Sequence, residues 1–325
     1  MNSLISYKSL FDSYLKNLKQ KDYPKGLYAP IDYLLSLGGK RLRPLLTLIA
    51  TEAFGKDPSD ALPAALSVEV FHNFTLMHDD IMDAAPLRRG KPTVHFKWDV
   101  STGILSGDAM LIQAYQYLED YPDPLYKKLN SLLSKTAIEV CEGQQFDMDF
   151  ETQNKVTISA YLEMIKLKTA VLVGCSLKLG AWIGKASNAD AQIIYDFGIL
   201  IGLAFQIQDD YLDAFGDPNS FGKQTGGDII ENKKTILYHK AMELGTLREK
   251  KAIKKWFKSS DPLNANQKIE AVKVLFESSK SAKECQQLVT YYTQEAFKKL
   301  DGLRINKNSK VLLKSFGQNL MERKF

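Results

Sequence analysis

Six aspartates have the side chains and the spacing that binding a divalent cation requires. They form two D-D-x-x-D patterns, Asp79, Asp80 and Asp83 in the first and Asp209, Asp210 and Asp213 in the second. At about 100° per residue, the first and last aspartates of each pattern lie one turn apart on one helix face. Their repulsion destabilises a helix by roughly a few tenths of a kcal/mol, which a cation would offset. Carboxylate oxygens suit Mg²⁺, which also takes water and substrate phosphates as ligands. The two patterns together predict a magnesium site, although one such cluster alone is also typical of a solvated acidic helix end.

Two basic turns supply the cationic groups that an anionic substrate would need. Arg88 and Arg89 follow the first aspartate cluster, and Lys40 and Arg43 follow a pair of glycines at 38–39. Arginine forks bind two phosphate oxygens at once, while lysine acts as a point charge. A basic turn beside glycines is also typical of a solvated loop, so this interpretation depends on the aspartates nearby.

Helical periodicity dominates the chain. Each aspartate cluster closes an apolar helical stretch, so the clusters are expected near helix ends. Apolar residues recur at spacings of three and four between 61 and 83 and between 190 and 213, the segments that carry the two clusters. The other predicted helices are 4–19, 27–37, 43–54, 105–120, 124–146, 157–183, 234–244, 247–258, 264–277, 281–301 and 308–322. Strand-like alternation is nearly absent, the breakers are short, and no linker divides the chain. We predict one all-α domain of ten or more helices over residues 1–325.

Composition and charge exclude several classes of protein. Of the 325 residues, 45% are hydrophobic and 25% are charged, as in globular rather than disordered proteins. The three cysteines, Cys141, Cys175 and Cys285, form no C-x-x-C pair, which argues against a disulfide framework and a zinc ribbon. A net charge of +5 is too small to indicate nucleic-acid binding. The most apolar run, 193–207, is short and contains polar residues, and no signal peptide is recognisable. We therefore predict a cytoplasmic protein without stable membrane insertion.

Five separated motifs together resemble those of the trans-isoprenyl diphosphate synthases. They are GGKRLRP at 38–44, HDDIMD at 78–83 followed by RRG at 88–90, KT at 168–169, FQIQDDYLD at 205–213 and GK at 222–223. The resemblance implies an all-helical fold with a central cavity, across whose mouth the two aspartate clusters face each other. It also implies that an allylic diphosphate (dimethylallyl, geranyl or farnesyl diphosphate) condenses with isopentenyl diphosphate and releases diphosphate. The implied cofactor is Mg²⁺, as three ions that bridge the clusters and the substrate diphosphate, and the implied assembly is a homodimer.

The same resemblance assigns roles to individual residues. The direct Mg²⁺ ligands would be Asp79, Asp83 and Asp209, while Asp80, Asp210 and Asp213 would ligate or orient from nearby. The allylic diphosphate would be held by Arg88, Lys168, Gln206, Lys223 and Lys233. Isopentenyl diphosphate would be held by Lys40, Arg43, His72 and Arg89. The groups expected to turn their dipoles toward the carbocation are Lys168, Thr169 and Gln206.

The helix before the first cluster suggests the product length. Phe74 lies about 7–8 Å and Phe71 about 12 Å below Asp79 along the helix axis, and Thr75 beside them is small. One extended isoprene unit spans roughly 4–5 Å, so a floor at these phenylalanines favours a product of three or four units. We expect C20 geranylgeranyl diphosphate in preference to C15 farnesyl diphosphate. The alternative is that both phenylalanines belong to the ordinary core.

Other functions share parts of this pattern. A catalytically silent subunit of a heteromeric prenyl synthase typically loses one aspartate cluster, and a terpene cyclase of the same fold normally replaces the second one. Both clusters are intact here. Glu69 and His72 form a Glu-x-x-His, as in di-iron bundles, but such bundles need two of these motifs and no second one occurs. A prenyl diphosphate synthase is therefore the favoured function.

Overall fold

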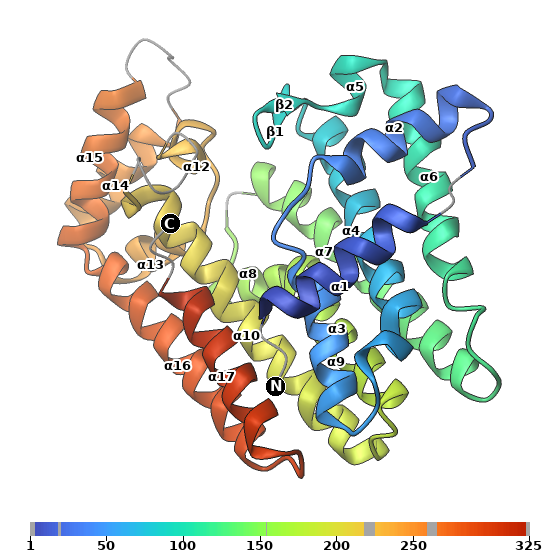
Figure 1. Ribbon diagram of the computed structural model, residues 1–325. Coiled ribbons are helices and arrows are strands. Elements are labelled where there is room, and N and C mark those ends of the chain that lie inside the picture. The colour runs from blue at the N-terminus through green and yellow to red at the C-terminus, as the bar shows by residue number, and fades with distance from the viewer. Residues whose placement is uncertain (1–3, 19–20, 154, 218–224, 259–264, 323–325) are drawn as a thin grey trace. The chain divides into compact units, whose positions relative to one another are not determined.

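Helices make up nearly all of the regular structure in the computed structural model, as the periodicity predicts (Figure 1). The structure describes residues 4–18, 21–153, 155–217, 225–258 and 265–322. The α-helices in these residues are α1 (Leu4–Asn17), α2 (Lys25–Ser36), α3 (Leu42–Ala53), α4 (Leu62–Met82), α5 (Val94–Lys97), α6 (Val100–Gln116), α7 (Leu125–Thr152), α8 (Ile158–Ile165), α9 (Val171–Ile183), α10 (Asn188–Phe215), α12 (Gly227–Ile230), α13 (Ile236–Leu244), α14 (Leu247–Trp256), α15 (Ala265–Ser278), α16 (Ser281–Asp301) and α17 (Lys307–Met321). The other elements are the 3-10 turn η1 (Pro58–Ala61), the π-helical turn η2 (Lys166–Ala170) and an antiparallel hairpin of β1 (Leu87–Arg88) and β2 (Lys91–Pro92). The predicted all-α class with ten or more helices is confirmed.

Most predicted helices agree with the structure within a few residues, and two differ for identifiable reasons. α6 begins at Val100 rather than 105 because Asp99 caps it, its carboxylate accepting the N–H of Thr102 at 2.7 Å. α7 continues to Thr152 rather than ending at 146. Its last turn is held by a distant residue, Lys234, whose ammonium donates to three backbone carbonyl groups there. A pairing over such a separation in the sequence leaves no local signal.

The chain divides into two compact units. Unit 1 contains the chain up to Lys135, Cys175–Ile194 and Arg304–Lys310. Unit 2 contains Thr136–Gly174, Tyr195–Leu303 and the chain from Val311. The chain passes from one unit to the other within α7, α9, α10 and α17. The organisation of residues 1–325 as one domain stays a prediction.

In unit 1, α4 is the central helix and packs against α2, α3 and α6 (Figure 1). Its buried side chains include Leu66, Phe71 and Met77. α6 comes close to the last turns of α4, because a Cβ at Gly107 would lie 2.2 Å from Nε2 of His78. This packing fixes the helix end that carries the first aspartate cluster.

A second close contact in unit 1 joins α3 to α9. The Thr51 hydroxyl donates to the carbonyl oxygen of Gly180 at 3.0 Å. A Cβ at Gly180 would lie only 2.1 Å from the carbonyl oxygen of Thr47. Glycine is therefore required on α9 here, and the contact anchors α3, the helix that begins at one of the two basic turns.

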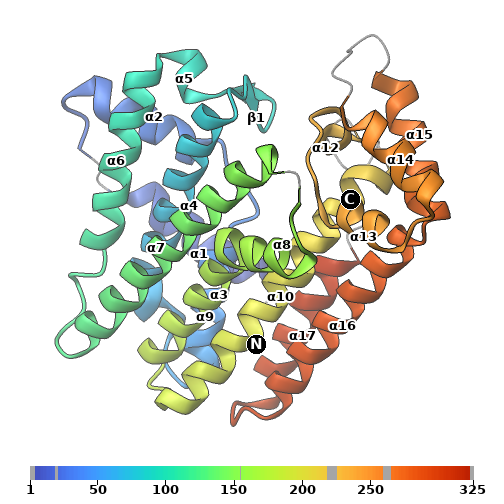
Figure 2. The same ribbon diagram turned by 180° about the vertical axis from the view of Figure 1, so that it is seen from behind.

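Unit 2 has its own apolar core, built from α8, α10 and the helices after it. Its buried residues include Ile207, Leu237, Val272, Phe276 and Val289. α13 contacts α8, α14, α15 and α16, and α14 and α15 lie side by side in both views of the molecule (Figure 1, Figure 2). This core supports the end of α10 that carries the second aspartate cluster.

Among the described helices, only α10 is long and apolar enough to cross a membrane by length and composition. Half of its most apolar window is buried inside the protein. The buried side chains include Ile194, Phe197, Ile201 and Ile207. These contacts are those of a core helix, which passes the same test of length and composition.

Gly180→Ala is expected to lower the melting temperature by several degrees, because the added Cβ meets the carbonyl group of Thr47. Overpacking of this kind typically costs about 1–3 kcal/mol, and each kcal/mol shifts the melting temperature by about 2 °C, the lower end of the range for proteins of roughly 150–250 residues. Differential scanning calorimetry measures the effect. Gly26→Ala is the matched control, since no atom lies within 4 Å of its added Cβ and alanine is the better helix former. Equal melting temperatures for the two variants would contradict the contact.

Candidate active site

The two aspartate clusters share one arrangement, in which the middle aspartate is buried. Asp80 is 3% exposed and Asp210 is 5% exposed. The outer aspartates are less buried; they are Asp79, Asp83, Asp209 and Asp213. The first cluster lies at the C-terminal end of α4 and the second in the last two turns of α10. The negative end of a helix dipole adds to the charge of carboxylates placed there, so both helix ends favour a cation.

Arg88 neutralises the middle aspartate of the first cluster. Its Nε donates to Oδ2 of Asp80 at 2.8 Å and its Nη2 donates to Oδ1 at 2.6 Å. This is the bidentate pairing that arginine favours. Asp79 and Asp83 are then the carboxylates of this cluster that suit Mg²⁺. The predicted contact of Arg88 with the allylic diphosphate stays a prediction.

The basic turn before α3 uses backbone conformations that favour glycine. Gly38 has a φ of 76° and Gly39 a φ of 140°. Arg41, two residues later, also has a positive φ, of 52°. The guanidinium of Arg89 donates to the carbonyl oxygen of Gly38. A Cβ at Gly39 would lie 3.0 Å from Nη2 of Arg89. The glycine pair of the sequence motif therefore brings the two basic turns together.

Arg41 itself points into unit 1 and does not face solvent. Its Nη1 lies 2.5 Å from Oε1 of Glu69, and its Nη2 donates to the carbonyl oxygen of Leu35 at 2.7 Å. Glu69 also accepts from the amide of Asn73 at 3.0 Å. This carboxylate therefore serves an arginine, contrary to the di-iron alternative. Among the described residues, no group of three His, Cys, Asp or Glu side chains is arranged to hold a metal.

Unit 1 contains a surplus of positive charge around His72. Of the four arginines in the basic turns, two have carboxylate partners at ion-pair distance. The other two, Arg43 and Arg89, have none within the described part of the chain. Burial lowers the pKa of Arg43 to about 10. Burial, and then the neighbouring arginines, hold the pKa of His72 well below its ordinary value, so the imidazole is neutral at pH 7. Two unbalanced guanidinium groups beside a neutral hydrogen-bonding ring suit an anion such as a diphosphate.

The residues expected to limit the product stack along α4. Phe71 is fully buried, and its ring centroid lies 5.6 Å from that of Phe74. Phe74 also packs against His78 at 4.8 Å. The Thr75 hydroxyl donates to the carbonyl oxygen of His72 at 2.8 Å. Their role as a floor for the product stays a prediction.

In unit 2, a chain of hydrogen bonds holds the middle aspartate of the second cluster. The Tyr161 hydroxyl donates to Oδ2 of Asp210 at 2.6 Å, and the Gln206 amide donates to Oδ1 at 3.1 Å. The carbonyl oxygen of Gln206 accepts from the Thr169 hydroxyl at 3.2 Å. Thr169 and Gln206, both predicted site residues, are thus oriented together with Asp210.

A further carboxylate, Asp228, joins the second cluster at the start of α12. Its backbone N–H donates to Oδ2 of Asp213 at 3.0 Å. The turn before it needs Gly226, whose φ is 84° and whose Cβ would lie 2.7 Å from Ile269. Burial and the charge of Asp213 raise the pKa of Asp228. Burial and the charge of Asp228 raise the pKa of Asp210 to about 8. A cation would relieve carboxylates crowded in this way, and their oxygen atoms are the type of donor that Mg²⁺ prefers.

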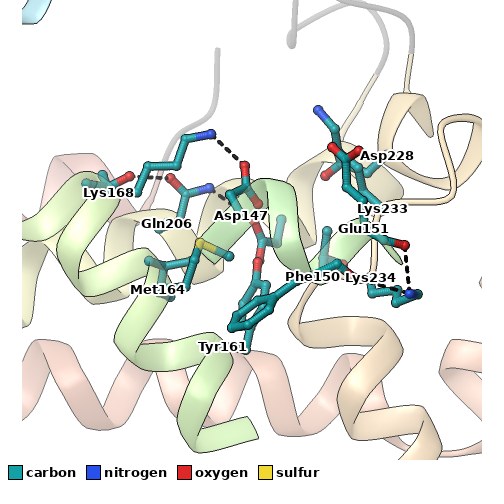
Figure 3. A pocket seen from close by; sticks show the side chains of 14 residues that line it. Asp147, Phe150, Glu151, Tyr161, Met164, Lys168, Gln206, Asp228, Lys233 and Lys234 are labelled. Carbon is teal, nitrogen blue, oxygen red and sulfur yellow. Dashed lines mark hydrogen bonds and ion pairs between the residues drawn. The ribbon is translucent and has the colours of Figure 1, made fainter. Parts of the chain in front are cut away.

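A cavity of about 150 Å³ lies within unit 2, beside this cluster (Figure 3). Its charged lining consists of Asp147, Glu151, Lys168, Asp210, Asp228, Lys233 and Lys234. The ammonium of Lys168 donates to Oδ2 of Asp147 at 2.6 Å, as Figure 3 shows. Nζ of Lys233 lies 3.1 Å from Oε2 of Glu231. The cavity therefore gathers several residues that the sequence motifs place far apart: Lys168, Thr169, Gln206, Asp210 and Lys233.

The predicted continuous helix 157–183 is interrupted by the π-helical turn η2, which carries Lys168 and Thr169. Such turns occur frequently at functional sites. Two glycines allow the neighbouring helices to approach it. A Cβ at Gly143 of α7 would lie 2.2 Å from the backbone nitrogen of Lys168, and one at Gly202 of α10 would lie 2.6 Å from Cα of Ala170. The turn is therefore fixed by tertiary packing.

The structure adds residues to those predicted from sequence. They are Arg41, Glu69, Asp147, Tyr161 and Asp228. Asp228 could have been identified from the sequence, since it follows a glycine pair fifteen residues after Asp213. The other four residues have no sequence feature, apart from their residue type, that marks them as part of the site. Of the predicted residues, Lys223 lies outside the residues that the structure describes, and Lys40 is exposed at the basic turn of unit 1.

Similar proteins are known for this arrangement of helices and motifs. The family model of the polyprenyl synthetases matches residues 24–275. The chain is 45% identical over 237 residues to a geranylgeranyl diphosphate synthase of Methanosarcina mazei, covering 72% of this chain and 73% of that protein. It is 36% identical over 320 residues to a geranylfarnesyl diphosphate synthase of Natronomonas pharaonis, covering 93% and 91%.

Solved structures agree with these relatives. A crystal structure of geranylgeranyl pyrophosphate synthase matches with a TM-score of 0.96 and 53% identity, covering 100% of both chains. The geranylgeranyl pyrophosphate synthase of Corynebacterium glutamicum, crystallised with isoprenyl diphosphate and magnesium, matches with a TM-score of 0.83 and 26% identity over 99% and 97% of the chains. The fold is the all-helical isoprenoid synthase fold. The chain belongs to the polyprenyl synthetase family. The resemblance inferred from the motifs and the prenyltransferase class are confirmed.

Glu69→Gln is expected to destabilise the protein strongly, because it removes the nearer carboxylate of the buried guanidinium of Arg41 and leaves only that of Asp12, which lies 3.9 Å from Nε. Breaking a buried pair in this way costs about 3–5 kcal/mol. Thermal unfolding measures the change. Glu163→Gln is the matched control, since it removes an exposed carboxylate that lies 2.9 Å from Lys166, and exposed pairs contribute about 0–1 kcal/mol. A loss at Glu69 no larger than at Glu163 would contradict the assigned role of the buried pair.

Proposed function

We propose that this protein transfers an allylic prenyl group from its diphosphate to isopentenyl diphosphate, with release of diphosphate. The observation that carries the proposal is the separation of charge among the site residues. Paired carboxylate clusters lie at two helix ends, and two arginines without carboxylate partners lie beside a neutral histidine. A cation site and a separate anion site are what two diphosphate substrates require.

Each charged group has a distinct task in the proposed reaction. Lys168, Gln206 and Lys233 bind the allylic diphosphate, and Lys223 and Arg88 are proposed to join them. Arg43, Arg89, His72 and Lys40 bind isopentenyl diphosphate and orient its double bond, which converts an encounter of two substrates into an oriented step. When bound, Mg²⁺ supplies Lewis-acid stabilisation of the departing diphosphate. Asp79, Asp83 and Asp209 are the proposed ligands of three such ions.

The proposed condensation needs no protein base. Breaking the allylic C–O bond leaves a carbocation and diphosphate, and the double bond of isopentenyl diphosphate attacks the cation. The proton that is then lost goes to the departing diphosphate. The hydroxyl of Thr169 and the amide oxygen of Gln206 lie 3.2 Å apart beside the cavity of unit 2, where their dipoles can face positive charge.

We propose a C20 product, geranylgeranyl diphosphate, in preference to C15 farnesyl diphosphate. The stacked pair Phe71 and Phe74 supports a floor at this depth. The relatives carry names for both C20 and C25 products, so the measured product decides between neighbouring lengths. A silent subunit and a terpene cyclase are the alternatives, and both fail to make a longer prenyl diphosphate when supplied alone with the two substrates.

We further propose a cytoplasmic homodimer. The support for a second copy is an apolar face on α6, which exposes Val100, Ile104, Leu105 and Ile112. Four large exposed apolar side chains on one helix support an interface, with Asp108 lying between them on the same face. Light scattering should give twice the mass of the chain.

Replacement of Asp79 and Asp83 with alanine is expected to abolish turnover, because it removes both outer carboxylates of the first cluster. Release of product from isopentenyl diphosphate and a radiolabelled allylic primer, with Mg²⁺ present, measures the loss. Asp22→Ala with Glu119→Ala removes the same charge from exposed positions in unit 1 and should leave the rate unchanged. Near-normal activity of the Asp79 and Asp83 variant would refute the metal role.

Phe74→Ala combined with Phe71→Ala is expected to lengthen the product by at least one isoprene unit, because it deepens the floor on α4. Chromatography of dephosphorylated products gives the chain length. Phe96→Ala, at a phenylalanine that is 59% exposed, serves as the control and should leave the length unchanged. An identical product distribution from all three proteins would assign the two phenylalanines to the ordinary core.

A further inference from the structure

One short segment of unit 2 is strongly basic. Residues 247–258, which are α14 and the two residues after it, contain six Lys or Arg and one Glu. The whole chain has 43 Lys and Arg against 38 Asp and Glu, so the remaining residues hold 37 of each sign. This segment therefore carries a net charge of +5 by itself.

Five of these basic residues form a single face, which we call the cationic stripe. Its members are Arg248, Lys251, Lys254, Lys255 and Lys258. At 100° per residue the four that lie within α14 fall within an arc of about 120°, together with Leu247, and Lys258 follows two residues after the helix ends. All five are exposed, whereas Ile253, on another side of the helix, is fully buried. Glu249 lies outside the arc and is held in the capping box with Thr246.

The stripe differs from the other lysine-bearing helices of unit 2. Lys166, Lys240 and Lys298 each form an ion pair with a glutamate three residues away, at 2.9, 2.9 and 2.6 Å. None of the five stripe side chains forms an ion pair with another described residue. Their spacing of three and four residues brings like charges together, which destabilises a helix. An external anionic surface would compensate this repulsion.

Apolar groups lie beside the stripe. Leu247 is 80% exposed and Leu244, at the end of α13, is 47% exposed. An open groove of about 580 Å³ between α14 and α15 begins at Arg248, and its apolar walls include Trp256 and Val274. A basic helix face flanked by exposed leucines combines the two attractions that hold a helix at a membrane interface.

We propose that the cationic stripe docks the protein on the surface of a membrane containing anionic phospholipids. The lysines meet the headgroup phosphates, and Leu244 and Leu247 enter the boundary between headgroups and acyl chains. Nucleic acid fits less well, because the stripe has one arginine fork and no exposed aromatic side chains interleaved with its charges to stack on bases. The proposal does not depend on the catalytic assignment, since none of these residues lines the cavity of unit 2.

Sedimentation with vesicles tests the proposal on the full-length protein. Vesicles of 70% phosphatidylcholine and 30% phosphatidylglycerol should bind the protein at low salt, and vesicles of phosphatidylcholine alone should not. Each basic residue near such a surface contributes roughly a fivefold gain in partition. Replacing Lys251, Lys254, Lys255 and Lys258 with glutamine should therefore lower the partition coefficient at least a hundredfold. Glutamine preserves helix propensity, and the variant should keep the melting temperature and the activity toward soluble substrates.

The matched control removes the same charge elsewhere. Replacing Lys21, Lys25, Lys127 and Lys307, all exposed, with glutamine should change the partition coefficient less than fivefold. Equal weakening by the two sets would overturn the proposal, because net charge alone would then explain binding. Failure of the unchanged protein to prefer anionic vesicles would overturn it as well. So would stripe-dependent binding to single-stranded RNA without binding to vesicles.

A second variant tests the apolar part of the docking surface independently of charge. Leu244→Ser with Leu247→Ser should weaken binding to anionic vesicles severalfold and make the remaining binding more sensitive to salt, since salt screens the charges alone. Unchanged partition and salt dependence in this variant would contradict insertion into the membrane interface.

Discussion

Carboxylates crowded at the C-terminal ends of two helices impose the main electrostatic constraint on this protein. The helix dipole adds negative charge at those ends, and burial makes the charge harder to solvate. In both clusters the middle aspartate is withdrawn into the protein and satisfied there. Asp80 receives the fork of Arg88, and Asp210 receives the hydroxyl of Tyr161 and the amide of Gln206. The outer carboxylates of each cluster are left nearer the surface, where a cation can reach them.

The arginines of unit 1 meet the opposite requirement, which is the binding of an anion. A guanidinium that already holds a carboxylate has fewer donors left for a phosphate, and Arg41 and Arg88 are engaged in this way. Their pairing shapes the basic turns around Arg43 and Arg89, which have no such partner among the described residues. The same four residues, all of one type, thus divide into two that are held by carboxylates and two that have no such partner among the described residues.

Structural features that depend on local spacing could be predicted from the sequence, whereas features that depend on partners distant in the chain could not. Helices, the clusters at their ends and the glycine turn at 38–39 all follow from periodicity and residue type. The pairings of Lys168 with Asp147 and of Tyr161 with Asp210 join positions 21 and 49 residues apart, and neither member marks the other. Lys234 extends α7 beyond its predicted end for the same reason. The motifs were sufficient to identify the family, whereas tertiary contacts determine the geometry around the motifs.

The π-helical turn at Lys166–Ala170 changes the rotational phase of the helix that follows it. A π turn accommodates about one more residue than an α turn, so the helix after it is out of phase with the helix before it by roughly 100°. Side chains of α8 and α9 that would share one face in an unbroken helix are thereby directed to different neighbours. Losing a single residue here would restore regular winding on both sides, yet it would rotate Lys168 and Thr169 away from Asp147 and Gln206. The widened turn thus acts as a one-residue insertion, which the close packing of Gly143 and Gly202 against it holds in place.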